Sequence, residues 1–165
     1  MEGNRQPPIK YIERITATYT ALGYEPYAWS YRDRESALAT VDKPLAESKL
    51  GVIATGGIYQ RGQTAFTYRD DVTYRAIPSD VLSDDLSATH FAYDLTDARK
   101  DINVVFPIDA LRMLEVNGVI GELATSLFTC MGGIYSQRRV DEELAPALVE
   151  RCLDDELDVV LLIPV

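Results

Sequence analysis

The side chains best suited to proton chemistry gather in the stretch 77–133. His90 is the only histidine among the 165 residues, and Tyr93, Asp94 and Asp101 follow it closely. An unperturbed imidazole titrates near neutral pH, so His90 is the first candidate general acid or base. A neighbouring carboxylate would orient the ring or raise its pKa, which makes Asp94 and Asp101 its candidate partners. We therefore predict that this stretch holds the functional site.

A simpler explanation of the same residues is equally consistent with the sequence. A lone histidine is as often a hydrogen-bonded residue of a turn as a catalytic group. Asp94, Asp97 and Asp101 would also lie at positions i, i+3 and i+7 of a helix, where they would form a solvated acidic face. For the aspartates taken singly, this second interpretation is the favoured one.

Cys130 stands between Thr129 and Met131, just before two glycines and at the expected end of a strand. It would be a nucleophile if a positive group or a helix N-terminus lowered the pKa of its thiol. A buried and inert cysteine is the commoner case. The other cysteine, Cys152, is predicted to lie on the apolar side of a helix. The two form no Cys-x-x-Cys pair, and with a single histidine we expect no metal site.

A short apolar run over 49–55 predicts a buried strand, and Gly56-Gly57 follows it directly. Loops at the carboxyl ends of strands are where open α/β sheets bind ligands, so Thr55, Gly56 and Gly57 are candidate substrate-binding residues. A turn that requires positive φ explains the glycines equally well. The loop lacks the glycine pattern and the lysine of a phosphate-binding loop.

The remaining elements alternate between strands and helices. A helix is predicted from Pro7 to a stop at Gly23, a short strand over 86–91 that ends near His90, and a second helix from Pro107. A further helix over 141–153 should begin late or kink at Pro146. The run 158–163 is apolar enough for a strand buried on both faces, but no later element follows to cover it, so we expect an exposed strand edge or apolar face. This order predicts an α/β fold with a mainly parallel, Rossmann-like sheet and flanking helices. We expect residues 1–42 to form an N-terminal helix and a polar connection, and 43–165 a single α/β domain.

Composition excludes several classes of function. A net charge of −10 repels phosphate backbones and anionic lipid surfaces, and the basic residues form no patch, so nucleic-acid and membrane binding are not expected. No apolar run approaches the ~20 residues that span a bilayer, and the N-terminus lacks the features of a signal peptide. Few cysteines and no leader together predict a cytoplasmic protein.

Several motifs occur in an order that resembles the B component of the glycine, sarcosine, betaine and D-proline reductases, the selenoprotein B family. The resemblance covers residues from about Lys43 onward, and the run over 101–107 is its most specific piece. The matching segments are Ala54-Thr55-Gly56-Gly57-Ile58-Tyr59, Ile77-Pro78-Ser79-Asp80, Thr89-His90, Tyr93-Asp94, Lys100-Asp101-Ile102-Asn103-Val104-Val105-Phe106-Pro107, Gly118-Val119-Ile120-Gly121-Glu122-Leu123-Ala124 and Met131-Gly132-Gly133.

The resemblance implies an oxidoreductase that cleaves a carbon–nitrogen bond of a small amine or amino acid with a dithiol/disulfide redox partner. It implies no cofactor in this chain, but a selenocysteine or cysteine just after Val165 and, in some members, a pyruvoyl group on a partner subunit. A thiol or selenol carrier protein would be another partner. Together with the residues singled out above, the candidate catalytic residues are His90, Asp94 and Asp101, with Cys130 as an alternative nucleophile. The candidate substrate-binding residues are Thr55, Gly56, Gly57, Tyr93 and Asn103.

Two departures from the family pattern bear on that activity. Ala92 stands where a second histidine often occurs, and the sequence stops at Val165, before the redox residue. A selenocysteine codon taken as a stop would give such an ending, and so would a gene fragment. We therefore expect a C-terminally incomplete sheet, no activity of the chain alone, and an oligomer or hetero-complex. The alternative is a non-catalytic interaction subunit or a decayed remnant of the family.

Overall fold

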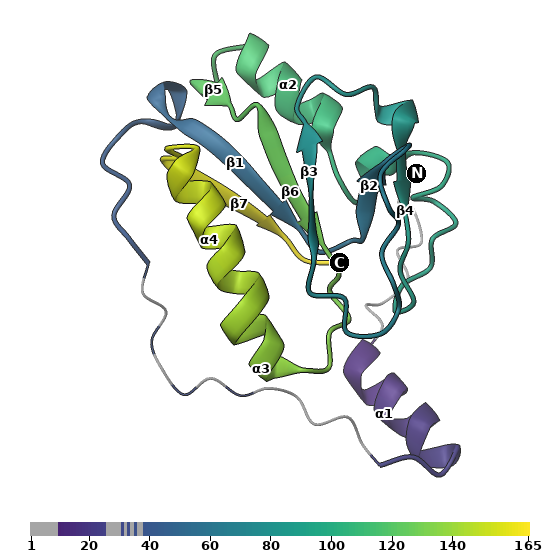
Figure 1. Ribbon diagram of the computed structural model, residues 1–165. Coiled ribbons are helices and arrows are strands. Elements are labelled where there is room, and N and C mark those ends of the chain that lie inside the picture. Colours follow the sequence, from purple (N-terminus) through teal and green to yellow (C-terminus); the bar gives the residue numbers. More distant parts are fainter. Residues whose placement is uncertain (1–9, 26–30, 32, 34, 36–37) are drawn as a thin grey trace, which may run out of the picture. The chain divides into compact units, whose positions relative to one another are not determined.

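The computed structural model describes residues 10–25, 31, 33, 35 and 38–165 (Figure 1). The chain divides into two compact units, Met1–Ala37 and Leu38–Val165. The first unit contains helix α1 (Tyr11–Ala21), which ends before Gly23 at φ +82°. This confirms the predicted helix and its stop, whereas the predicted start at Pro7 lies outside the described residues.

The second unit is built on one mixed sheet around strand β1 (Lys49–Ala54). Strand β7 (Val159–Ile163) runs parallel to β1 along its whole length. β5 (Glu122–Leu123) pairs in parallel with the start of β1, and β6 (Ser126–Cys130) with its end. β3 (Tyr74–Pro78) lies antiparallel to β6, so the sheet is only partly parallel. The predicted α/β class is confirmed, but the mainly parallel, Rossmann-like description fits only the strands around β1.

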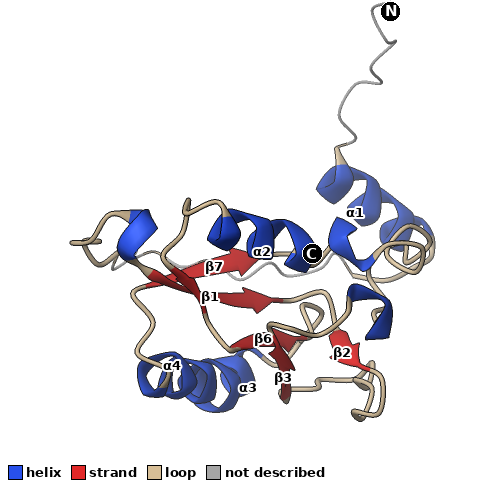
Figure 2. Cartoon of the chain, turned by 90° about the horizontal axis from the view of Figure 1, so that it is seen from above, coloured by secondary structure: helices blue, strands red, loops and turns tan. Residues whose placement is uncertain are grey.

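Alternate residues of β1 and β6 face two separate cores, as the period of two in a strand requires. One core joins Val52 and Leu127 to helix α2 (Ile108–Val116), which follows Pro107 as predicted. The other joins Phe128 to helix α4 (Ala145–Asp154). Figure 2 shows α2 and α4 on opposite sides of the sheet. The two cores fix which side chains of β1 and β6 point to each face of the sheet. Because β1, β6 and β7 are parallel, their carboxyl ends lie at the same edge of the sheet.

Helix α4 continues a helical turn, α3 (Gln137–Arg139), through the π-helical turn Val140–Leu144. The wider turn ends two residues before Pro146, which has no N–H to donate and whose ring crowds the carbonyl four residues before it. This confirms that proline disturbs the predicted helix over 141–153. None of the helices that the structure describes is long and apolar enough to cross a membrane.

A second, two-stranded sheet carries the chain toward His90. β2 (Ile58–Gln60) pairs antiparallel with β4 (Leu86–Ala88), which confirms the strand predicted over 86–91 in its first half. His90 follows the last residue of β4 by two positions. The second sheet thus delivers the only histidine of the chain to the vicinity of the loop that follows β1.

The strand over 158–163 has the exposed face that we expected from it. β7 forms at the predicted place, none of its residues is fully buried, and Leu162 is 66% exposed. Among the described residues β7 pairs only with β1. The sequence predicted the strand from its apolar content, but burial also requires neighbours on both sides.

Candidate functional site

The candidate site begins where β1 and β7 end side by side. The Thr55 N–H donates to the Ile163 carbonyl at 3.0 Å, and the Thr55 hydroxyl accepts from the Val165 N–H, also at 3.0 Å. These two bonds hold the last residues of the sequence against the loop 55–57. The C-terminal end of β7 therefore lies at the edge where the predicted ligand-binding loop is found.

Gly57 shows why this loop is rich in glycine. Its φ is +66°, its N–H donates to the Cys130 carbonyl at 3.0 Å, and its carbonyl accepts from the Thr89 N–H at 2.9 Å. A Cβ built here would stand 2.0 Å from the Thr89 oxygen. The turn that requires positive φ is therefore confirmed at Gly57, whereas a ligand contact of this loop stays a prediction.

His90 lies at the centre of the site and is only 4% exposed. Its Nδ1 accepts a hydrogen bond from the Ala92 N–H at 3.0 Å, which places the ring proton on Nε2 in the neutral tautomer. Nε2 is buried and has no hydrogen-bond partner among the described residues. Burial lowers the pKa of His90, because the charged ring would lose its hydration. The result is a neutral imidazole with an unused N–H donor.

Tyr93 connects this imidazole to the loop after β1. The Tyr93 ring lies 4.7 Å from the His90 ring, and its hydroxyl donates to the Gly56 carbonyl at 2.9 Å. Burial raises the pKa of Tyr93, so the hydroxyl keeps its proton at neutral pH. A Cβ at Gly56 would lie 3.4 Å from Cγ2 of Val165. The structure therefore brings together three predicted residues, His90, Tyr93 and Gly56, with Thr55 on the same edge.

The aspartates predicted to orient His90 have other partners. Asp94 accepts from the Thr96 N–H at 2.9 Å and from its hydroxyl at 2.6 Å, and the hydroxyl bond is the main cause of the lowered Asp94 pKa. Asp101 accepts from the N–H and side-chain amide of Asn103 at 2.9 and 3.0 Å. Neither carboxylate is hydrogen-bonded to His90; the main-chain N–H of Ala92 orients the ring instead.

Asn103, predicted to bind substrate, is fully engaged within the chain. Its side-chain amide also donates to Asp109 at 2.7 Å, and its oxygen accepts from the Asp109 N–H at 3.0 Å. These bonds join the 3₁₀ turn Ile102–Val104 to the start of α2. The geometry explains a structural role for Asn103, and its substrate-binding role stays a prediction.

Cys130, predicted as a possible nucleophile, lies in the core rather than in the site. It is 3% exposed, and burial raises the pKa of its thiol to about 11. Almost no thiolate exists at neutral pH with such a pKa, so the thiol has little nucleophilic character. Its carbonyl, by contrast, holds the loop through the Gly57 N–H. Nucleophilic attack by Cys130 stays a prediction that this environment disfavours.

Sequence reasoning did not identify Gly132 and Phe91 as site residues. A Cβ at Gly132 would lie 3.1 Å from both the Thr55 hydroxyl and the Val165 carbonyl. The Phe91 ring stacks on His90 at 5.5 Å, and a Cβ at Gly133 would collide with that ring at 2.3 Å. The pair of glycines was visible in the sequence, but their close neighbours come from distant segments.

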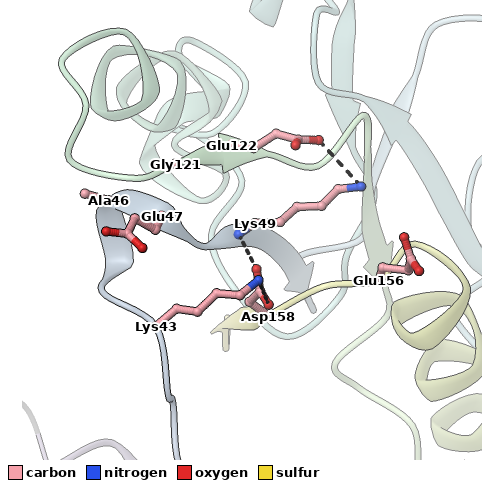
Figure 3. A pocket seen from close by; sticks show the side chains of 8 residues that line it. All are labelled: Lys43, Ala46, Glu47, Lys49, Gly121, Glu122, Glu156 and Asp158. Carbon is pink, nitrogen blue, oxygen red and sulfur yellow. Dashed lines mark hydrogen bonds and ion pairs between the residues drawn. The ribbon is translucent and has the colours of Figure 1, made fainter.

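A cavity of about 690 Å³ lies at the opposite edge of the sheet, where β1, β5 and β7 begin (Figure 3). Its charged side chains are largely paired. Lys43 Nζ lies 2.6 Å from Asp158 Oδ1, and Lys49 Nζ lies 3.5 Å from Glu122 Oε1. Asp158 also accepts from the Lys49 main-chain N–H at 2.9 Å. These bonds join strand starts that are distant in sequence, so we interpret this cavity as structural despite its volume.

Comparison with known proteins agrees with the motifs at the carboxyl edge. The family model described as glycine/sarcosine/betaine reductase selenoprotein B matches residues 35–164. The D-proline reductase subunit gamma of Acetoanaerobium sticklandii is 33% identical over 122 residues, which cover 74% of this chain and 50% of that protein. The sarcosine reductase complex component B subunit beta of Peptoclostridium acidaminophilum is 33% identical over 116 residues, 66% of this chain and 27% of that protein.

A third relative is the glycine reductase complex component B subunit gamma of Symbiobacterium thermophilum. It is 28% identical over 150 residues, which cover 84% of this chain and 34% of that protein. The chain thus spans half or less of the length of each of these relatives. No solved structure matches the chain significantly.

Proposed function

The chain belongs to the glycine/sarcosine/betaine reductase selenoprotein B family, and on that premise we propose that it forms part of the substrate-reducing component of a multi-subunit reductase. The proposed reaction is reductive cleavage of a carbon–nitrogen bond in a small amine or amino acid. A dithiol would supply two electrons and become a disulfide, the nitrogen would leave as an amine, and the carbon and nitrogen would each gain a proton.

One observation supports this proposal most directly: the end of β7 lies against the loop after β1, and the residues around it include glycines, which leave room for a side chain. Val165 lies against Thr55, Gly56 and Gly132, where added Cβ atoms would fill the space around it. The family pattern implies a selenocysteine or cysteine directly after Val165. These glycines fit that residue at the same edge, where it would supply the selenolate or thiolate of the reaction.

His90 would act as the general acid in this site. Burial favours its neutral form, and the Ala92 N–H on Nδ1 leaves the proton on Nε2, which has no described partner. A neutral imidazole with a free N–H can donate a hydrogen bond to an anionic sulfur or selenium. It can also pass a proton to the leaving nitrogen. Tyr93 would position this arrangement by binding the Gly56 carbonyl.

The partners follow from the relatives, which are named as subunits of reductases or reductase complexes. We propose that this chain likewise works in a hetero-complex. A pyruvoyl-bearing subunit would hold the substrate, and a carrier protein would exchange the thiol or selenol. The proposed substrates are amines or amino acids of the kind that those names give: glycine, sarcosine and D-proline.

The test uses a chain continued past Val165 by the selenocysteine- or cysteine-bearing segment, assembled with the partner subunits of a related reductase. Dithiol-dependent amine release is measured for wild type, His90→Gln and His90→Ala. A positioned general acid is typically worth about 10²–10⁴-fold in rate, so both variants should lose activity on that scale. His90→Gln should keep its melting temperature better than His90→Ala, because it fills more of the buried space.

A second candidate function, a non-catalytic interaction subunit, is favoured by the exposure of β7. Its outer edge is unpaired among the described residues, and Leu162 exposes two thirds of its surface. Unpaired apolar edges bind other strands readily. In that case His90→Gln would leave turnover of the assembled complex unchanged, while Leu162→Lys would abolish assembly. Unchanged turnover in His90→Gln would therefore replace the first proposal with the second.

A further inference from the structure

His90 is only 4% exposed, and its Nε2 is closed off from water without a hydrogen-bond partner among the described residues. Phe91 lies nearly parallel to the imidazole, with 5.5 Å between the ring centroids and 11° between the planes. Tyr93 lies 4.7 Å away at a tilt of 41°, and the Ala92 N–H occupies Nδ1. A buried donor of this kind can act on another molecule only if some part of its cover moves.

The two aromatic rings against His90 differ in how firmly they are held. Tyr93 is anchored, because its hydroxyl donates to the Gly56 carbonyl at 2.9 Å. Phe91 has no polar group to bind and exposes 41% of its surface. Its ring contacts Tyr68 and Tyr135, at 6.1 and 6.4 Å between centroids, and these side chains are themselves 60% and 62% exposed. Phe91 can therefore move without disturbing the core, whereas Tyr93 cannot.

The backbone around the histidine shows the same contrast. The chain before His90 is fixed, because the Thr89 N–H is hydrogen-bonded to the loop after β1. Residues 91–93 form a bend that belongs to no helix or strand. A Cβ at Gly133 would stand 2.3 Å from the Phe91 ring, so the ring fills a space that only a glycine leaves free. The ring therefore has a defined closed position at the end of an irregular segment.

We propose that Phe91 is a gate over His90: its ring covers the imidazole in the free chain and leaves the stack to admit the group that binds Nε2. The inference rests on the proposed function and deepens it, because it adds control of access to the same general acid. The closed ring keeps water from pairing with the N–H, and an unpaired buried donor is costly. A group that displaces Phe91 removes this cost by accepting the hydrogen bond, so opening and binding favour each other.

The single histidine allows a direct test on the chain alone, with diethyl pyrocarbonate, which carbethoxylates accessible neutral imidazoles. At neutral pH and above the ring is mostly uncharged, so the rate reports access rather than charge. If the open form is a minor state of about 0.1–10%, Phe91→Ala should react roughly tenfold faster than wild type or more. Phe91→Tyr keeps a ring in place and should react at nearly the wild-type rate. Equal rates in wild type and Phe91→Ala would overturn the gate.

Tyr68→Ala is the matched control, because Tyr68 contacts Phe91 while no described contact joins it to His90. It should raise the rate far less than Phe91→Ala does, and an equal rise would overturn the specific role of Phe91. The His90 pKa is a second readout, since burial alone lowers it and Tyr93 is the titratable side chain described in contact with the ring. The pKa should rise toward 6.5 in Phe91→Ala and stay low in Phe91→Tyr. An unchanged pKa in Phe91→Ala would contradict the gate.

A measurement on the wild type covers the case in which Phe91→Ala does not fold. The modification rate is followed at urea concentrations below the unfolding transition. Movement of one ring exposes little new surface, so the rate should be almost independent of urea. A rate that rises as steeply as the unfolding constant would mean that only global unfolding exposes His90, and the gate would be overturned.

These tests need no turnover, so their failure differs from a failure of the proposed function. If the His90 variants lose activity in the assembled complex while Phe91→Ala reacts no faster than wild type, the reductase role stands and the gate does not. If Phe91 controls access while His90→Gln keeps full turnover, the gate stands and the proposed general acid does not.

Discussion

The parallel strands of this chain begin among paired charges and end among glycines and aromatic rings. At the amino edge, Lys43 and Lys49 bind Asp158 and Glu122 across a wide cavity (Figure 3). At the carboxyl edge, His90 is buried with an unused N–H. A buried polar group without a partner is costly, whereas exposed ion pairs cost and contribute little. Asp155 Oδ2, at the end of α4, is also buried without a hydrogen-bond partner, but its carboxylate lies 3.6 Å from Arg151. A buried polar group with neither a hydrogen-bond partner nor an ion pair, rather than cavity volume, therefore marks the candidate site.

The two edges also differ in how they tolerate change. The carboxyl edge depends on main-chain groups in close contact, such as Gly57 and the Thr89 carbonyl. The amino edge depends on flexible side chains that can rearrange in water. We therefore expect substitutions to have large effects at the carboxyl edge and small ones at the amino edge.

The largest effect is expected from Gly57→Ala. The new Cβ would stand 2.0 Å from the Thr89 oxygen, in a backbone with φ +66° that alanine rarely adopts. Strain and overpacking together should lower the free energy of unfolding by roughly 3 kcal/mol or more. Urea denaturation followed by circular dichroism measures the loss.

Gly118→Ala provides the control for this prediction. Gly118 has nearly the same φ, +68°, but no atom within 4 Å of an added Cβ. The free energy of unfolding of Gly118→Ala should fall by only about 1 kcal/mol, because the strained backbone conformation is its only cost. If Gly57→Ala and Gly118→Ala lowered the free energy of unfolding equally, the close packing around Gly57 would not contribute to stability.

A smaller effect is expected from the protonation of His90. Burial lowers the folded-state pKa of His90 below its ordinary value of 6.5, so the unfolded chain binds the proton more tightly. The stability linked to His90 should therefore be complete above pH 6.5 and decrease as the pH falls toward the folded pKa. The ring protons of the single histidine can be followed by NMR. A measured pKa at or above 6.5 would contradict the buried, neutral form.

The comparison of edges also separates what the sequence could predict from what it could not. The apolar run over 49–55 and Gly56-Gly57 predicted β1 and its turn, because both depend on local residue types. The position of His90 after a short strand was predicted from local residue types as well. The hydrogen-bond partner of the His90 ring could not be predicted, because it is the main-chain N–H of Ala92, and every residue type except proline carries such a group.

Long-range contacts explain the other differences. The run over 158–163 had the composition of a buried strand, but no described strand covers its outer side. The antiparallel pairing of β3 with β6, which makes the sheet mixed, depends on the path of the chain between them. Asp94 and Asp101 are near His90 in sequence, yet each accepts a hydrogen bond from a main-chain N–H two residues further along the chain. Proximity in sequence favours local turns over contacts with the ring.

The smallest effect is expected at the amino edge, from Asp158→Asn. The Lys43 side chain, more than the Lys49 N–H, lowers the pKa of Asp158 below 3.8. The stability that the Asp158 carboxylate contributes is therefore present above pH 3.8 and lost as the pH falls through the folded-state pKa of Asp158. Asp158→Asn should lower the melting temperature slightly at pH 7, and less at low pH. Its control is Asp97→Asn, which removes an exposed carboxylate paired only with Lys100 three residues away.

The sharper measurement on Asp158→Asn is the pKa of His90. The six residues of β1 separate the two edges by roughly 20 Å, about twice the distance over which 0.1 M salt screens charges. The NMR titration of His90 should therefore give the same pKa in Asp158→Asn as in the wild type. A clear shift would mean that the strands transmit a structural change from one edge to the other, and the two edges would then have to be treated as one coupled site.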